Sequence, residues 1–139
     1  MPMVGHIAQT GQIVAVDFRE GNAAPAKQNL EFIQQCQAAL PKDCYVQSLR
    51  IDAAGYQQSI IEYCEENNIN YAIRAVKSRA VKAIIENLRE HDWQCFIDKE
   101  GEEVDEQQTY RTSHCIGNYE KAFSLVIQRS KNRVNHRWI

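Results

Sequence analysis

The sequence predicts an α/β fold from the order of its apolar segments. Residues 12–19, QIVAVDFR, alternate in polarity and are rich in β-branched side chains, which is typical of a strand. Residues 45–52 and 70–76 are two further strand segments, and apolar residues at helical spacing lie between them. A helical segment capped by Ser78 follows, so strand and helix alternate over residues 45–90. This order predicts a βαβ unit, with a parallel pair of strands and helices packed on the sheet.

The segments on either side complete the predicted architecture. Thr10 and Gly11 predict a turn that joins a short opening strand to residues 12–19 as a hairpin. Pro25 is placed to open the next helix and Pro41 to end it. One face of that helix is apolar and carries Leu30, Ile33, Cys36 and Leu40.

After Trp93 the apolar clusters become shorter and are separated by the turn sequences DKEGEE and IGN. This change predicts an antiparallel β segment, and we therefore divide the chain into a core of residues 1–92 and a β-rich segment with a basic tail, 93–139. The acidic run from Asp98 to Glu106 fits a solvated hairpin tip better than a metal site.

Composition limits the classes of function. The chain has 139 residues, of which 44% are hydrophobic and 24% charged, and its net charge is −2. These values are typical of one globular domain and give no overall attraction to nucleic acid or to a membrane. The sequence contains neither an apolar run of membrane-spanning length nor a signal peptide at its start, so we expect a cytoplasmic protein without a membrane partner.

Cysteine, histidine and glycine spacing gives little support to the common cofactor sites. The five cysteines form no C-x-x-C pair, which indicates reduced, mostly buried thiols and gives no support to a zinc site. The four histidines are scattered, and the six glycines form no nucleotide-binding motif. We therefore predict no cofactor-binding residues.

Asp52 is the strongest single candidate for a site. In LRIDAAGY (49–56) it stands where a strand ends and a small-residue turn begins. In open α/β sheets ligands bind at the carboxyl ends of strands, where a carboxylate can hold Mg²⁺. Alternatively, Asp52 caps the helix that follows, and spacing alone leaves both interpretations open.

Basic residues gather in two places. Arg74, Lys77, Arg79 and Lys82 lie around the end of the third strand segment and the start of the helix after it. The tail RSKNRVNHR contains four basic residues, Arg129, Lys131, Arg133 and Arg137, and no acid. Both clusters are candidates for contacts with DNA phosphates, and ordinary solvated charge explains them nearly as well.

Three sequence strings together resemble the catalytic domain of bacterial insertion-sequence transposases of the DDE class. They are R-x-GN (19–22), R-x-D-x-x-G-Y (50–56) and Y-x-I-R (71–74), and the likeness runs from about residue 4 to 137. The resemblance implies a ribonuclease-H-like mixed sheet with flanking helices and an antiparallel β insertion. It implies that Asp52 is the second acid of a D-D-E triad that holds two Mg²⁺ or Mn²⁺ ions for cleavage and transfer of DNA strands at terminal inverted repeats.

The departures from that family matter equally. No acid of this chain matches the first aspartate or the final glutamate of the triad, so we expect a fragment of a transposase that binds no metal and cuts no DNA by itself. The alternative is a non-catalytic remnant that binds DNA or an intact transposase, with Arg74, Lys77, Arg79 and Arg133 as the DNA-binding candidates.

The family's first strand lies between the hairpin and the strand that ends at Asp52, and this chain has no match to it. Either the segment 122–129 fills the gap, or exposed strand edges pair between chains. We expect the second, and hence a homo-oligomer joined through strand edges.

Overall fold

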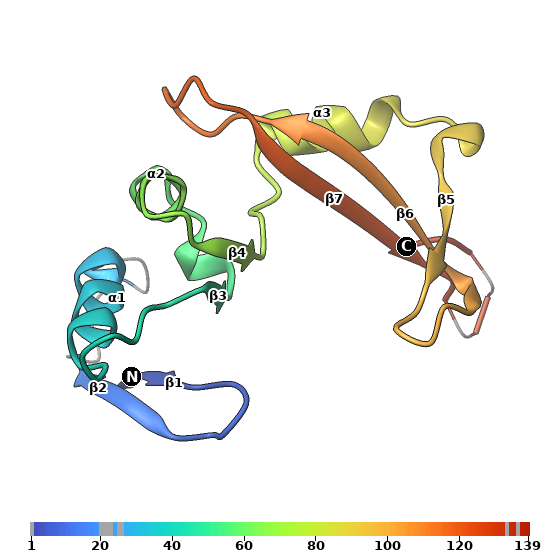
Figure 1. Cartoon of the computed structure of the whole chain (residues 1–139). Helices are drawn as coiled ribbons and strands as arrows, with labels where there is room; N and C mark the ends of the chain where they lie inside the picture. The colour runs from blue at the N-terminus through green and yellow to red at the C-terminus, as the bar shows by residue number, and fades with distance from the viewer. Residues whose placement is uncertain (1, 20–23, 25–26, 133, 136) are drawn as a thin grey trace. The chain divides into compact units, whose positions relative to one another are not determined.

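A computed structural model describes residues 2–19, 24, 27–132, 134–135 and 137–139. The chain forms two compact units, residues 1–76 and 77–139, which are described separately below (Figure 1). Each unit mixes helix and strand, and the predicted α/β class is confirmed. The predicted boundary at residues 92 and 93 concerns the family's domain organisation and stays a prediction. Within the described ranges, no helix has the length and apolar character that crossing a membrane requires.

The first unit contains two small sheets and two α-helices. Its elements are β1 (Pro2–His6), β2 (Ile13–Phe18), α1 (Asn29–Ala38), β3 (Ser48–Ile51), the 3-10 helix η1 (Ala53–Gly55), α2 (Gln58–Glu66) and β4 (Asn70–Ile73). Strands β1 and β2 form the predicted antiparallel hairpin, whereas β3 and β4 pair in parallel across α2. The hairpin and the βαβ unit are therefore confirmed, as two separate two-stranded sheets.

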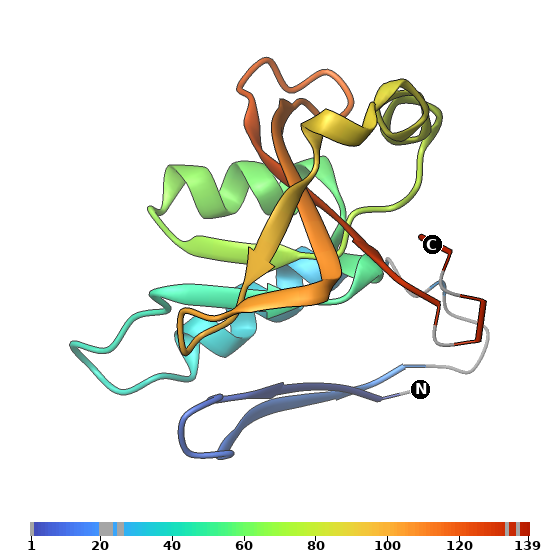
Figure 2. The ribbon, with the colours of Figure 1, turned by 90° about the vertical axis from the view of Figure 1, so that its right-hand side faces the viewer.

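Helix α1 packs against both sheets of the first unit. Toward the hairpin it presents Phe32 and Cys36, and a Cβ atom added at Gly5 would lie only 2.5 Å from the Cys36 sulfur. Toward the βαβ unit it presents Ile33, which joins Ile60 of α2 in the buried core. Figure 2 shows α1 beside β3 and the hairpin as a separate ribbon pair. The helix thus holds the two sheets in one unit.

The start of α1 differs from the predicted helix. The first helical residue is Asn29, and Gln28 before it has a left-handed backbone, with φ of 59°. Pro25, which we predicted to open the helix, lies outside the described residues. The predicted apolar face is confirmed in part, because Ile33 is buried and Leu30 packs against the core, but the buried Phe32 was missed.

The second unit is a helix with a three-stranded sheet. Its elements are α3 (Arg79–Asn87), the 3-10 helix η2 (Glu90–Asp92), β5 (Gln94–Ile97), β6 (Glu103–His114) and β7 (Phe123–Ser130). The sheet is antiparallel in the order β5-β6-β7, which confirms the predicted β segment. The turn between β5 and β6 is closed by Asp98, whose carboxylate accepts from the amides of Glu100 and Glu102. This part of the acidic run is therefore a hairpin tip.

Arg129, near the end of β7, is enclosed by aromatic and polar side chains. Its guanidinium lies 4.3 Å from the ring centre of Trp93 and 4.5 Å from that of Trp138. It also donates to both carboxylate oxygens of Glu90, at 2.9 and 2.6 Å, and to the side chain of Gln108. One cation thus links η2, two strands and the chain's last residues, and the Arg129 side chain is only 11% exposed.

The five cysteines are free thiols, but the expectation that most are buried was wrong. Cys64 is buried and Cys36 half-buried, whereas the other three, Cys44, Cys95 and Cys115, are exposed. Burial raises the pKa of the Cys64 thiol to about 11, with a smaller contribution from the nearby Glu65 charge. The core thiol is therefore protonated and unreactive at neutral pH.

We predict that Arg129→Lys destabilises the second unit by about 1–2 kcal/mol, because lysine cannot stack on both indoles while donating in a fork to Glu90. Trp93 and Trp138 are the chain's two tryptophans, so tryptophan fluorescence during urea unfolding reports on this cluster. Arg111→Lys, at an exposed position of β6, is the matched control. Equal urea midpoints for the two variants would contradict the prediction.

The same cluster gives an expected pH dependence. The hydrogen bond from Arg129 holds the pKa of Glu90 below its ordinary value of 4.5. The stabilisation by this pair is thus fully present above that value and is lost as the pH falls through the lowered pKa of the folded protein. Glu90→Gln should remove this part of the pH dependence.

Candidate functional site

Asp52 directly follows β3 and begins the turn that contains η1. Its Oδ1 atom accepts a hydrogen bond from the amide of Ala54 at 2.9 Å, and its backbone is extended. The residue itself is exposed. Asp52 is therefore a cap of the short 3-10 helix η1, whereas α2, the longer helix that follows, begins after Gln57. The cap interpretation is thus confirmed only for this turn, and Asp52 is exposed to solvent.

Gly55 permits this tight turn. A Cβ atom at this position would lie 2.3 Å from a methyl carbon of Ile51, the last residue of β3. The Gly55 amide donates to the carbonyl of Asp52 at 3.0 Å, and the residue is buried. Only glycine allows the turn to fold back onto the end of the strand, which explains the D-x-x-G spacing physically. Burial also raises the pKa of the next side chain, Tyr56.

A buried polar network leads from the hairpin to this turn. Arg19 donates to Asp17 at 2.9 Å and to the side-chain oxygen of Asn29 at 2.8 Å. The amide nitrogen of Asn29 in turn donates to the carbonyl of Ala54 at 2.9 Å. Asn29 is only 1% exposed. Sequence reasoning noted Arg19 only as part of a motif and missed Asn29, because an asparagine at the start of a helix has no distinctive spacing.

The predicted DNA-binding residues are only partly brought together. Lys77 and Arg79 lie at the start of α3 with Lys82 one turn later, and all three are exposed. Arg74 is also exposed and follows β4 in the first unit. Arg133 lies outside the described residues. The tail's Arg129 is held by Glu90, and it is therefore a structural cation.

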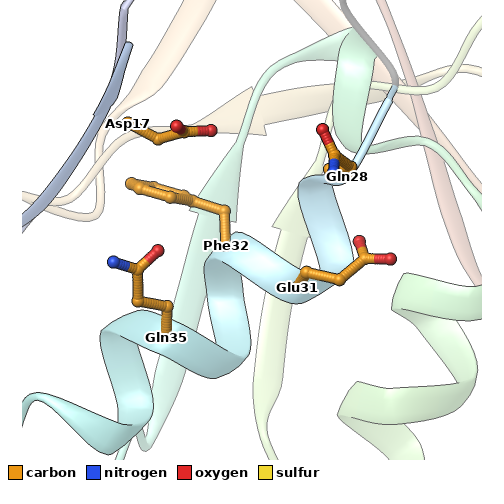
Figure 3. Close-up of a pocket in the computed structure, with 5 residues that line it drawn as sticks. All are labelled: Asp17, Gln28, Glu31, Phe32 and Gln35. Atoms are coloured by element: carbon orange, nitrogen blue, oxygen red, sulfur yellow. The ribbon is translucent and has the colours of Figure 1, made fainter. Parts of the chain in front are cut away.

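A hollow of about 230 Å³ opens between β2 and α1. Figure 3 shows Asp17 extending from the strand toward the other residues that line it, which are Gln28 just before α1 and Glu31, Phe32 and Gln35 of α1. None of the predicted site residues lines this hollow, and its Asp17 carboxylate already pairs with Arg19.

A comparison with known protein families shows which family this chain belongs to. A family model described as transposase DDE domain group 1 matches residues 1–137. The chain belongs to this family. The resemblance read from the three sequence strings is thereby confirmed. A search of curated proteins gave no significant match, and neither did a search of solved structures.

DDE transposases act on DNA and generally use divalent metal ions. Asp52 supplies a carboxylate, the ligand type that such ions prefer. Within the described residues, however, no group of three or more acidic, histidine or cysteine side chains could hold an ion. The described donors of this DDE-family chain thus do not fit a two-metal centre by themselves.

Proposed function

We propose that this chain is part of the catalytic core of a DNA transposase, with Asp52 as one ligand of the catalytic Mg²⁺ or Mn²⁺. In this proposal residues 1–92 belong to a ribonuclease-H-like core and residues 93–139 to its β insertion and basic tail. By itself the chain does not cleave or join DNA.

One observation carries the proposal: the exposed carboxylate of Asp52 stands at the carboxyl end of β3, within a parallel β3–β4 pair. Ligands of open α/β sheets gather at such strand ends. Membership of a DDE transposase family supports a metal-ligand role for this carboxylate, since the acids of such enzymes act on DNA through metal ions.

The expected inactivity follows from the number of ligands. Two-metal chemistry holds its ions about 3.5–4 Å apart, and one carboxylate cannot hold both. Asp17, which is linked to the Asp52 turn through Arg19 and Asn29, already pairs with the guanidinium of Arg19 at 2.9 Å. In this proposal the other two acids of the triad, which have no counterpart in this chain, supply the remaining metal ligands.

An alternative function is non-catalytic binding of DNA or of an intact transposase. It is supported by the start of α3, where Lys77, Arg79 and Lys82 are exposed and the first helical turn contains no acid. Cations at a helix N-terminus repel the helix dipole, so a phosphate between them would relieve the repulsion. Arg74 is the fourth described candidate.

We further propose that the chain forms a homo-oligomer through strand edges. Each strand of the first unit pairs with one other strand among the described residues, which leaves edges on both small sheets. The segment 122–129, the alternative occupant of such an edge, contributes to β7 and pairs with β6. The hairpin also exposes apolar side chains that association would cover: Val4, Ile13, Val16 and Phe18.

We expect no nicking when the chain is incubated with Mn²⁺ or Mg²⁺ and a duplex that carries terminal inverted repeats. Product on a sequencing gel is the measurement. Asp52→Asn is the matched control, because asparagine keeps an oxygen for the Ala54 amide and removes only the charge. Metal-dependent nicking that disappears in Asp52→Asn would overturn the expected inactivity while supporting Asp52 as a ligand.

The DNA-binding alternative predicts retention of duplex DNA at low salt that weakens steeply toward physiological salt, by about 0.9 logarithmic units per phosphate contact and tenfold change in salt. Replacing Lys77 and Arg79 by alanine should reduce that slope by about two contacts. A double replacement of exposed Lys27 and Lys42 removes the same charge elsewhere and should change little. Absence of retention even at low salt would reject the alternative.

Association through strand edges predicts a dimer or larger species in sedimentation at micromolar concentration. Lysine at Phe18, which is 83% exposed, should shift the equilibrium toward monomer, because a charge on an exposed strand opposes pairing. Lysine at Gln12, an exposed residue between β1 and β2, is the control. A compact wild-type monomer would contradict the proposal.

A further inference from the structure

The guanidinium of Arg19 connects β2 to the start of α1 through hydrogen bonds to three described residues. It donates to the carboxylate of Asp17, to the side-chain oxygen of Asn29 and to the carbonyl of Gln28 at 3.0 Å. The Arg19 side chain is only 8% exposed. A planar guanidinium directs its donors in a fixed geometry, so these contacts hold the strand and the helix start in one arrangement.

The contact with Asn29 fixes the orientation of its amide. Because Arg19 donates to the Asn29 oxygen, the Asn29 nitrogen must point the other way, and it donates there to the Ala54 carbonyl. The same carbonyl accepts from the side chain of Gln57 at 2.7 Å. Ala54 is thus held through its carbonyl, while its own amide holds the Oδ1 atom of Asp52.

The left-handed backbone of Gln28 is consistent with these hydrogen bonds of Arg19 and Asn29. A positive φ is unfavourable for a residue with a Cβ atom and persists only where its surroundings impose it. Here the carbonyl of Gln28 is an acceptor for Arg19, and the following residue is the buried Asn29. The strained position therefore places the Asn29 amide in the interior, where it reaches the Asp52 turn.

From this geometry we propose that Arg19 and Asn29 are positioning residues for the carboxylate of Asp52. Arg19 orients Asn29, and Asn29 fixes the carbonyl of Ala54. The amide of Ala54, in the neighbouring peptide unit of the same turn, holds the Asp52 carboxylate in one rotamer. The functional meaning of this arrangement rests on the proposed role of Asp52 as a metal ligand. Such ligands must be held within about 0.5 Å of their working geometry by surrounding hydrogen bonds.

The test is Asn29→Asp in the full chain. Aspartate keeps an oxygen for Arg19 but loses the donor to Ala54 and sets an oxygen against that carbonyl. Asn67→Asp is the matched control, because the Asn67 amide also donates to a backbone carbonyl, that of Tyr63, at an exposed position of the same unit.

Two spectroscopic readouts separate positioning from simple support of the fold. Three-bond couplings to the side-chain carbon of Asp52 report its rotamer, and the amide of Gly55 reports broadening by millimolar Mn²⁺. In Asn29→Asp we expect the couplings to be averaged over several Asp52 rotamers. We also expect about fivefold less broadening of the Gly55 amide, because the loss of one hydrogen bond changes an equilibrium by about this factor. Asn67→Asp should match wild type in both. A folded Asn29→Asp with a single Asp52 rotamer and unchanged broadening would overturn the proposal.

Wild-type measurements keep the proposal testable if Asn29→Asp does not fold. The side-chain amide protons of Asn29 should exchange as slowly as core backbone amides, with Asp52 in one rotamer. Rapid exchange or an averaged rotamer would reject the network. Broadening at millimolar Mn²⁺ requires only transient contact with the Asp52 carboxylate and is compatible with a chain that holds no metal ion by itself. Failure of the metal role looks different: wild type would then show no Mn²⁺ broadening at Gly55, while the coupling comparison would still decide the positioning.

Discussion

The buried side chain of Asn29 is the constraint on which the first unit depends. A primary amide removed from water needs hydrogen-bond partners, and an unsatisfied group would cost about 1–3 kcal/mol. The Asn29 oxygen accepts from a strand residue on one side, and its nitrogen donates to a turn carbonyl on the other. The hairpin, α1 and the Asp52 turn are consequently tied by directional bonds in addition to apolar packing, which alone would tolerate sliding.

Much of the architecture was predictable because it follows from periodicity and turn chemistry. The alternation of residues 12–19, the turn at Thr10-Gly11 and the strand–helix–strand order of 45–76 each depend on neighbours in the sequence, and each was confirmed. The antiparallel β segment was predictable because short apolar clusters between glycine-containing turns leave few other arrangements, and it was confirmed.

What escaped prediction depends on contacts between distant residues. Nothing local marks Asn29 as buried, since its environment comes from Arg19 and from a turn 25 residues later. Arg129 stood in a basic tail that the sequence left open between phosphate contact and ordinary solvated charge, yet Trp93, Trp138 and Glu90 enclose it. The exposure of Cys44, Cys95 and Cys115 was also misjudged. Residue type indicates how often cysteines are buried in general, but it does not indicate which cysteines of one chain are buried.

The cap at Asp52 has a consequence for the choice of cation. An oxygen that already accepts an amide proton is a poorer ligand, so the carboxylate offers a cation chiefly its other oxygen, in one direction. Large Ca²⁺ ions accept carboxylates through one oxygen or through both and tolerate irregular shells, whereas small Mg²⁺ ions demand well-directed oxygen ligands in a near-octahedral shell. In the metal-ligand role that we propose for Asp52, the hydrogen bond from the Ala54 amide therefore disfavours the binding of a large cation through both carboxylate oxygens.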